Sequence, residues 1–165
     1  MDDDDPRRLL DERAICRRLA EYGRGMDRAD VALVASVYHA DGTDDHGSFR
    51  GLGSDFAEYA IARLAGYRST MHTMGNPLIW FIDDDSAIVE THVCARQFRD
   101  DEGPVLETFG GRYVDRFERR DGEWKIAHRA MVREWDKVEH IELAFAPGRY
   151  PDGRRGPDDI SYARP

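Results

Sequence analysis

The residues of this chain best suited to proton transfer near neutral pH are its histidines. His72 stands at the head of MHTMGNPLIWF, a run that otherwise reads as a buried strand. His46 lies in the polar segment DDHGSF, and His92 and His128 lie in later strand-like runs. Histidine changes its charge between about pH 5 and 8, so each of these is either an ordinary residue or a candidate acid or base. Whether a histidine has an ordinary structural role or acts as an acid or base depends on the side chains that surround its ring in the fold.

The chemistry open to a histidine depends on whether a carboxylate lies beside it. A carboxylate bonded to one imidazole nitrogen fixes the tautomer, leaves the other nitrogen as an acceptor and stabilises the imidazolium once it forms. Such a dyad can remove a proton next to a carbonyl group or an electron-poor ring. The same imidazolium can then protonate a departing hydroxide, so a syn elimination of water needs only one base.

The first half of the chain has the pattern of three helices. Asp5 can cap a first helix and Pro6 suits its first turn. Four apolar side chains then recur at helical spacing: Ile15, Leu19, Tyr22 and Met26. Asp30 can cap a short second helix through VALVASVY, and Ser54 a third through DFAEYAIARLAGY. The Gly- and Asp-rich segment HADGTDDHGSFRGLGS separates the second helix from the third.

After Gly66 the pattern changes to strands. The runs STMHTMGNPLIWFID, SAIVETHVCARQF, LETFGGRYVDRFER and EWKIAHRAMVREW are rich in β-branched and aromatic residues and are separated by turn signals. Asp83–Asp85 forms one of these turns. The Gly110-Gly111 pair inside a strand predicts a bulge or a strong bend. The chain is therefore predicted to be an α+β domain, a curved antiparallel sheet wrapped around the N-terminal helices.

Composition limits the class of partner and the compartment. The 165 residues, 41% of them apolar, suffice for one domain with one modest core. The net charge of −9 argues against nucleic-acid and anionic-membrane partners. Cys16 and Cys94 lie in apolar patterns and are predicted to be reduced, buried thiols. No apolar run approaches the ~20 residues of a membrane span and the N-terminus is acidic, so we expect a cytoplasmic protein.

The order of these elements carries a resemblance to a known family. Helix, helix, DDHGSFRG, helix and then strands ending in RYVDRFERRDGEWKIAHR resemble the SnoaL-like branch of the nuclear-transport-factor-like, or cystatin-like, superfamily over about residues 9–135. The resemblance implies a cone made of a curved sheet and three helices. It also implies a pocket between sheet and helices, in which the inward-pointing polar residues set the chemistry.

Within that superfamily the chain most resembles the scytalone dehydratases, and in part the lindane dehydrochlorinases and bile-acid 7α-dehydratases. Their helix-end aspartate matches Asp27 in YGRGMDRAD, and their strand histidine matches His72 in STMHTMGN. The resemblance implies a catalytic dyad in which His72 is the base and acid and Asp27 orients it. Asp27 could instead cap the next helix, and His72 could be a satisfied core histidine.

Other positions depart from the family pattern, so no substrate is carried over. The scytalone dehydratases have a tyrosine in the loop after the second helix, and this position falls on His46, which could equally be an ordinary loop residue. The second pocket histidine of those enzymes falls near Phe98, and their pocket asparagine falls near Tyr113. The dehydrochlorinase arginine falls on Arg129 and its lysine on Tyr22, which also matches the spacing of the bile-acid dehydratase tyrosine.

Period-two alternation sorts the strand candidates by sheet face. Arg129 and His128 lie on opposite faces, so His128 points outward if Arg129 points into the cone. His92 shares a face with Phe98 and lines the pocket if Phe98 does. Arg129 could be buried in an ion pair or could bind a substrate oxygen.

The chain is thus predicted to be a cofactor-independent lyase, a dehydratase acting on a hydrophobic polycyclic, polyketide-like or steroid-like small molecule. Asp27 and His72 form its dyad. The candidates to orient the substrate are Tyr22, His46, His92, Tyr113 and Arg129. An isomerase or cyclase would begin with the same proton abstraction, and a non-catalytic binding module is the alternative from another class. The sequence has neither a His/Cys cluster at zinc spacing nor a Gly-rich phosphate loop, so no metal or cofactor is expected.

Three segments are predicted along the chain: an acidic leader (1–8), the cone domain (9–135) and a C-terminal tail (136–165). The tail begins with a possible short helix, KVEHIELAF, and continues with a Pro- and Gly-rich stretch. It could close the mouth of the cone as a lid or contact another subunit. The outer sheet face, with Trp124 and Val132 nearby, predicts a homodimer or homotrimer.

Overall fold

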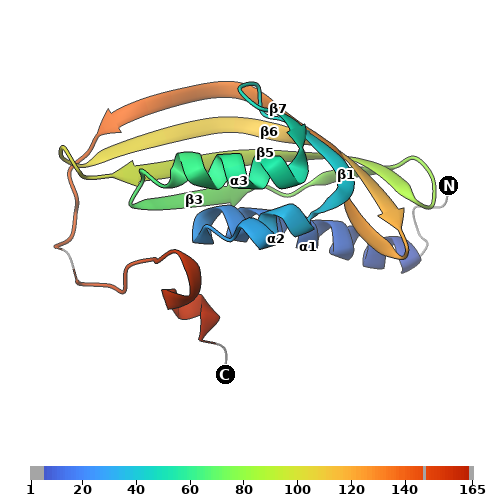
Figure 1. Ribbon diagram of the computed structural model, residues 1–165, viewed down its shortest axis with the longest axis horizontal. Coiled ribbons are helices and arrows are strands. Elements are labelled where there is room, and N and C mark those ends of the chain that lie inside the picture. The colour runs from blue at the N-terminus through green and yellow to red at the C-terminus, as the bar shows by residue number, and fades with distance from the viewer. Residues whose placement is uncertain (1–5, 147, 164–165) are drawn as a thin grey trace.

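A curved sheet arches over three helices in the computed structural model, which describes residues 6–146 and 148–163 (Figure 1). The helices are α1 (Pro6–Arg28), α2 (Val31–Ser36) and α3 (Gly53–Leu64). The strands are β1 (Tyr38–Asp45), β2 (Arg50–Leu52), β3 (Ser69–Met74), β4 (Leu78–Phe81), β5 (Ser86–Arg99), β6 (Val105–Arg120) and β7 (Glu123–His140). The predicted α+β class and cone architecture are confirmed.

The strand order is β2-β1-β7-β6-β5-β3, with β4 also paired to β5. All pairs are antiparallel except β1 with β7, which is parallel. The sequence did not predict β1 and β2, because the segment 38–52 is rich in Asp and Gly, which are depleted in strands. The run predicted as one first strand is divided at residues 75–77 into β3 and β4, which pair with different halves of β5.

The predicted bend at Gly110-Gly111 is present as a register shift between β6 and β7. A Cβ atom at Gly111 would lie 2.3 Å from the carbonyl oxygen of Val132, so only glycine permits this approach of the two strands. The shift increases the curvature of the sheet around the helices.

A second register shift, between Arg116 and Phe117, corrects the predicted alternation in β7. Phe117 pairs with Ile126 and Arg116 with His128, so Ala127 is the extra residue. Ile126 and Arg129 are consequently both buried, whereas His128 is exposed. Strict period-two alternation would put Ile126 and His128 on one face, which the bulge prevents, while the predicted opposite faces of His128 and Arg129 are confirmed.

Two of the predicted helix starts can be compared with the structure. The Asp30 cap is confirmed, since its Oδ1 accepts a hydrogen bond from the Leu33 amide at 2.9 Å. The Ser54 cap is wrong, because α3 already begins at Gly53 and has no side-chain cap. A Cβ at Gly53 would lie 2.3 Å from the Tyr38 ring, so close packing sets this helix start. The predicted Asp5 cap lies outside the described residues.

Helix α1 supplies much of the core. Its predicted apolar stripe, Ile15, Leu19, Tyr22 and Met26, is buried against the sheet. The helix begins at Pro6, so residues 6–8 of the predicted leader are helical.

Both thiols are free, as predicted. Cys16 is exposed, contrary to its predicted burial, because the residue after Ile15 points away from the sheet. Cys94 is half-buried. Among the described residues, no helix is long and apolar enough to cross a membrane.

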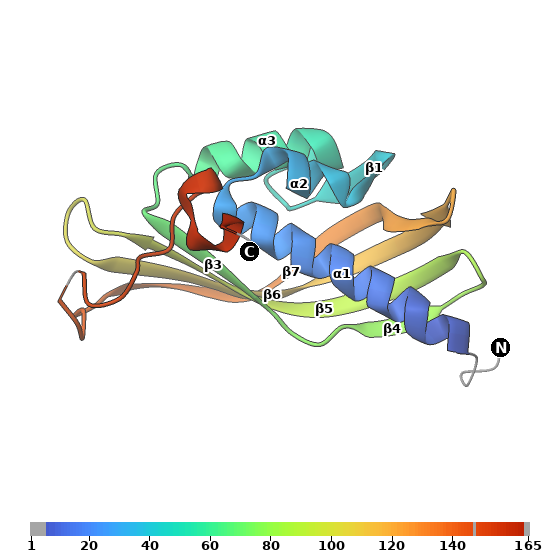
Figure 2. The same ribbon diagram turned by 90° about the horizontal axis from the view of Figure 1, so that it is seen from below.

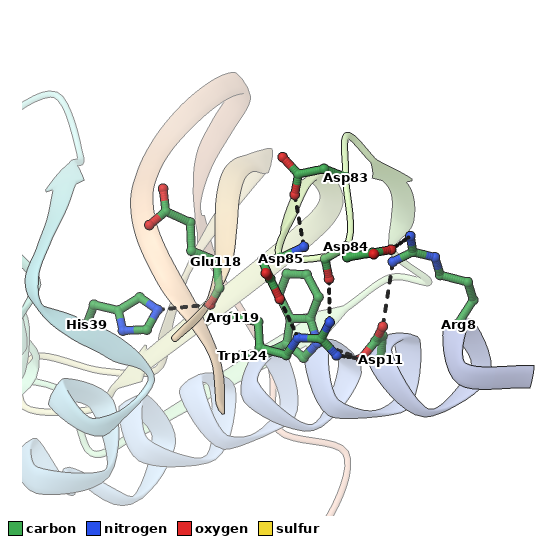
Figure 3. Close-up of polar contacts among 9 residues, drawn as sticks. All are labelled: Arg8, Asp11, His39, Asp83, Asp84, Asp85, Glu118, Arg119 and Trp124. Atoms are coloured by element: carbon green, nitrogen blue, oxygen red, sulfur yellow. Dashed lines mark hydrogen bonds and ion pairs between the residues drawn. The ribbon is translucent and has the colours of Figure 1, made fainter. Parts of the chain in front are cut away.

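Polar contacts fasten the first half of α1 to one end of the sheet (Figure 3). Asp11 accepts hydrogen bonds from Trp124 Nε1 at 2.8 Å and from Arg119 at 3.1 Å. Arg8 pairs with Asp84 at 2.9 Å, within the predicted Asp83–Asp85 turn. Trp124 is buried by these contacts, so its predicted place on the outer sheet face is wrong.

The C-terminal tail lies against the other end of α1 (Figure 2). Strand β7 continues to His140, so the predicted KVEHIELAF helix is wrong and the sheet extends past residue 135. Two short 3-10 turns follow, at Gly156–Asp158 and Ile160–Tyr162. Arg24 donates to Ser161 Oγ at 2.9 Å and Arg28 to the Arg154 carbonyl at 3.2 Å.

Replacing Gly111 should test the bend. We expect Gly111→Ala to lower the free energy of unfolding by about 1–3 kcal/mol, because the new methyl group must displace backbone in a packed sheet. Gly66→Ala is the matched control, since a Cβ there meets nothing within 4 Å. Urea denaturation of both variants measures the difference, and equal stabilities would contradict the assigned close approach.

Candidate active site

A cavity of about 570 Å³ lies between the helices and the sheet. Its apolar and aromatic lining includes Tyr22, Met26, Phe56, Ala60, Leu64, Phe109, Tyr113 and Met131. Its polar lining includes His46, Ser48, Tyr59, His72, Gln97, Glu107 and Thr108. The exposed side chains Arg63, Asp136, Lys137 and Val138 also border it, so it opens beside the ends of α3 and β7. The volume is that of a small-molecule site.

The predicted pair of Asp27 and His72 is in contact. Asp27 Oδ1 lies 2.7 Å from His72 Nδ1. The same carboxylate accepts the backbone N–H of His72, with the nitrogen 2.9 Å from Oδ2 and 3.1 Å from Oδ1. An ionised carboxylate can only accept, so Nδ1 carries the hydrogen and Nε2 is left with a free lone pair. His72 lines the cavity, and its side chain is only 5% exposed.

The end of α1 positions Asp27. Ala29 takes a left-handed conformation, with φ of 54°, which ends the helix and turns the chain into the Asp30 cap of α2. Gly25 allows α2 to pack closely, because a Cβ there would lie 2.7 Å from Val34 Cγ2. Asp27 is thereby held at the last turn of a helix whose preceding turns are buried.

Strand β3 positions His72. Alternation turns Thr70, His72 and Met74 inward, while Ser69, Met71 and Thr73 face outward. The strand lies at the edge of the sheet, where it pairs with β5 on one side only. The backbone N–H of His72 faces the unpaired side and would lack a partner without Asp27. One carboxylate therefore fixes both the strand and the imidazole ring.

A second carboxylate–imidazole pair borders the same cavity. His46 Nδ1 lies 2.5 Å from Asp44 Oδ1, and Tyr38 donates its hydroxyl to Asp44 Oδ2 at 2.6 Å. The Asp44 side chain is fully buried and that of His46 is 15% exposed. The His46 ring stacks on Phe56, with the ring centres 4.2 Å apart. The predicted place of His46 at the pocket thus comes with a partner, Asp44, that the prediction missed.

Sequence spacing contains the signal for this second pair. Asp44 and His46 are two residues apart at the end of a strand, so their side chains fall on one side of it. The signal was hidden because β1 itself was not predicted in this Asp- and Gly-rich segment.

Arg129 packs against the rings of Tyr22 and Tyr113, two residues that line the cavity. The Arg129 guanidinium carbon lies 4.2 Å from the Tyr22 ring centre and 4.0 Å from that of Tyr113. Arg129 also forms a fully buried bidentate ion pair with Asp115, at 2.6 and 2.7 Å. Arg129 is not among the residues that line the cavity, so the structure places it in a buried ion pair and not in contact with a substrate. Burial raises the pKa of Tyr22 and of Tyr113, which keeps both hydroxyl groups protonated.

The structure does not bring His92 to the cavity. Thr91, Val93 and Ala95 of β5 are buried, whereas His92 is exposed on the outer face of the sheet. Its predicted neighbour in the pocket, Phe98, is also not part of the lining, which this strand supplies through Ala95 and Gln97. His92 is therefore removed from the candidates for substrate binding.

The tail adds a charge near the dyad without lining the cavity. Burial lowers the pKa of Arg155, and the charge of Asp27 opposes this effect. Arg155 Nε and Nη2 are buried and have no hydrogen-bond partner among the described residues. No described residue after Val138 borders the cavity.

In the described part of the chain, no group of three His, Cys, Asp or Glu side chains is placed to share a metal ion.

The curved sheet, the three helices and the cavity between them define a cone-shaped α+β pocket domain. The chain belongs to the SnoaL-like domain family, whose model matches residues 7–130. The resemblance predicted from the sequence is confirmed. No curated protein matches the chain significantly.

Solved structures share the fold along most of the chain. A protein from Novosphingobium aromaticivorans described as "Putative Scytalone Dehydratase" is 25% identical with a TM-score of 0.72, covering 87% of this chain and 97% of that one. A hexachlorocyclohexane dehydrochlorinase, LinA type 2, is 22% identical with a TM-score of 0.74 and the same coverage of both chains. A protein of unknown function with a cystatin-like fold from Nostoc punctiforme is 20% identical with a TM-score of 0.64, covering 76% and 92%.

The buried ion pair beneath the cavity should matter more to stability than a surface pair on the same strands. We expect Asp115→Asn to cost about 3–5 kcal/mol in the free energy of unfolding, because Arg129 would stay buried without its counter-charge. Glu134→Gln removes one of the two acidic partners of Arg112 on the same two strands, and we expect little change because Glu134 is half exposed and Arg112 keeps Glu90. Urea denaturation compares the two, and equal losses would contradict this account.

Proposed function

We propose that the protein is a cofactor-independent lyase that eliminates water from a hydrophobic polycyclic small molecule. The observation that carries the proposal is the 2.7 Å contact of Asp27 with His72 in the wall of a cavity of small-molecule size. A binding module could use the bond from Asp27 to the His72 backbone to hold β3, but it has no need for a carboxylate on the imidazole ring. Membership of the SnoaL-like family and the likeness to the described scytalone dehydratase and the dehydrochlorinase support a lyase or isomerase.

The geometry suits proton abstraction from a carbon acid. Asp27 holds the hydrogen on Nδ1, so Nε2 of His72 can accept a proton from the carbon next to a carbonyl group. The negative charge of Asp27 stabilises the imidazolium that results. The electrons of the broken C–H bond form the new double bond, and the leaving group departs from the adjacent carbon. A protonated leaving hydroxide departs as water.

The cavity lining favours a flat, largely apolar substrate. Aromatic side chains from α1, α3 and β6 supply much of the wall, including Tyr22, Phe56 and Tyr113. Tyr22 borders the cavity, and its ring packs edge-on against that of Tyr113 with the ring centres 5.4 Å apart. Such aromatic walls favour contact with a flat ring system. We therefore propose a polyketide-like or steroid-like ring system that carries a ketone.

A proton-exchange assay tests the first chemical step without knowledge of the natural substrate. We expect the protein to accelerate exchange of deuterium from D₂O into α-tetralone, a bicyclic ketone, as followed by mass spectrometry. His72→Ala should reduce the rate by ~10²–10⁴, the usual contribution of a general base. Asp27→Asn should also reduce it, since an amide stabilises the imidazolium less. No acceleration by the wild type with any ketone of a bicyclic and tetracyclic panel would reject the enzyme in favour of a binding module.

His92→Ala is the matched control for the exchange assay. This histidine lies in the same sheet but on its outer face, so its removal should leave the exchange rate unchanged. A loss equal to that of His72→Ala would show that the assay reports general damage and not the dyad.

A further inference from the structure

We infer that His46, held by Asp44, is a second acid–base group that protonates the leaving group while His72 removes the proton from carbon. The inference rests on the proposed function and deepens it. Both imidazoles border the one cavity, and each has its Nδ1 against an aspartate. His72 projects from β3, the last strand of the path β2-β1-β7-β6-β5-β3, and His46 directly follows β1, the second strand of that path. A substrate in the cavity would therefore meet one imidazole from each side.

The burial of Asp44 argues for a function beyond structure. Its side chain is fully buried, and a buried carboxylate lowers stability unless its charge is compensated. Arg129, which lies beside it in the β1–β7 register, is bound bidentately by Asp115. The hydrogen bonds to Asp44 come instead from the Tyr38 hydroxyl and the His46 ring. An imidazolium at His46 is the cation that this arrangement can accommodate.

The His46 ring is held in one orientation. Asp44 fixes Nδ1, and Phe56 stacks against the ring with an interplanar angle of 23°. The backbone on either side is fixed by a tight turn, in which the His46 amide donates to the Phe49 carbonyl at 2.9 Å. Such a ring can present only Nε2 to the substrate, which is the requirement for a directed proton donor.

The two imidazoles divide the elimination into two proton transfers. Nε2 of His72 takes the proton from the carbon next to the ketone, and the C–H electrons form the carbon–carbon double bond. The carbon–oxygen bond breaks, and its electron pair takes the proton from Nε2 of the His46 imidazolium, so the hydroxyl leaves as water. His72 ends charged and His46 neutral. Exchange of one proton with solvent at each ring restores the starting state.

A pair of substrates that differ only in the leaving group separates this role from a structural one. Chloride is a weak base that departs without a proton, whereas hydroxide needs one. The probes are β-hydroxytetralone and β-chlorotetralone, both of which give naphthol on elimination, and the uncatalysed rates are subtracted. We expect His46→Gln to slow the loss of water by ~10²–10⁴ and to leave the loss of chloride nearly unchanged.

The outcomes distinguish this inference from the proposed function. Equal loss of both rates in His46→Gln would overturn the role of His46 as a proton donor, while a dependence of both rates on His72 would still support the lyase. Absence of any elimination by the wild type would overturn both. His128→Gln is the control, because that exposed histidine does not border the cavity and hydrogen-bonds Thr43.

A second variant guards against damage to the fold. Asp44→Asn keeps the size of the side chain, and circular dichroism and the melting temperature establish whether it folds. A folded Asp44→Asn should show the same selective loss of dehydration as His46→Gln. An unchanged ratio of the two elimination rates in a folded variant would contradict the coupling of Asp44 to His46.

Discussion

The carboxylate of Asp27 joins the helical layer to the edge of the sheet, and the site depends on this one contact. It accepts the otherwise unpaired backbone N–H of His72 and the ring Nδ1–H of the same residue. The first bond holds β3 against the end of α1, and the second selects the tautomer of the imidazole. Structural and chemical requirements therefore converge on one residue, which explains why the aspartate must stand at the end of the helix and not merely near the cavity.

The remaining architecture keeps that contact rigid. Asp11, Trp124 and Arg119 fasten the beginning of α1 to the sheet, far along the helix from Asp27 (Figure 3). The stack of Tyr22, Arg129 and Tyr113 fills the space beneath the cavity. Charged groups are thus buried in pairs around an apolar chamber, where electrostatic interactions are stronger than in water. A proton transfer in such a chamber is directed by these fixed charges.

Local patterns in the sequence predicted the helices and the long antiparallel strands, and the resemblance to the family predicted the pair of Asp27 and His72. They failed where distant residues decide the structure. Strand β1 exists because β7 pairs with it, although its own residues favour turns. The Ala127 bulge reverses the expected face of Ile126, and it reflects pairing with β6 and not the composition of β7. His92 was assigned to the pocket through Phe98, but the burial of its neighbours places it outside.

The most direct test of the central claim is the tautomer of His72, measured by ¹⁵N NMR on histidine-labelled protein at a pH where the ring is neutral. His72→Ala assigns the signal. The account predicts a protonated Nδ1 and an unprotonated Nε2 in the wild type, and a loss of this preference in Asp27→Ala. A protonated Nε2 in the wild type, or a spectrum that Asp27→Ala leaves unchanged, would contradict the claim that Asp27 prepares His72 to act as a base.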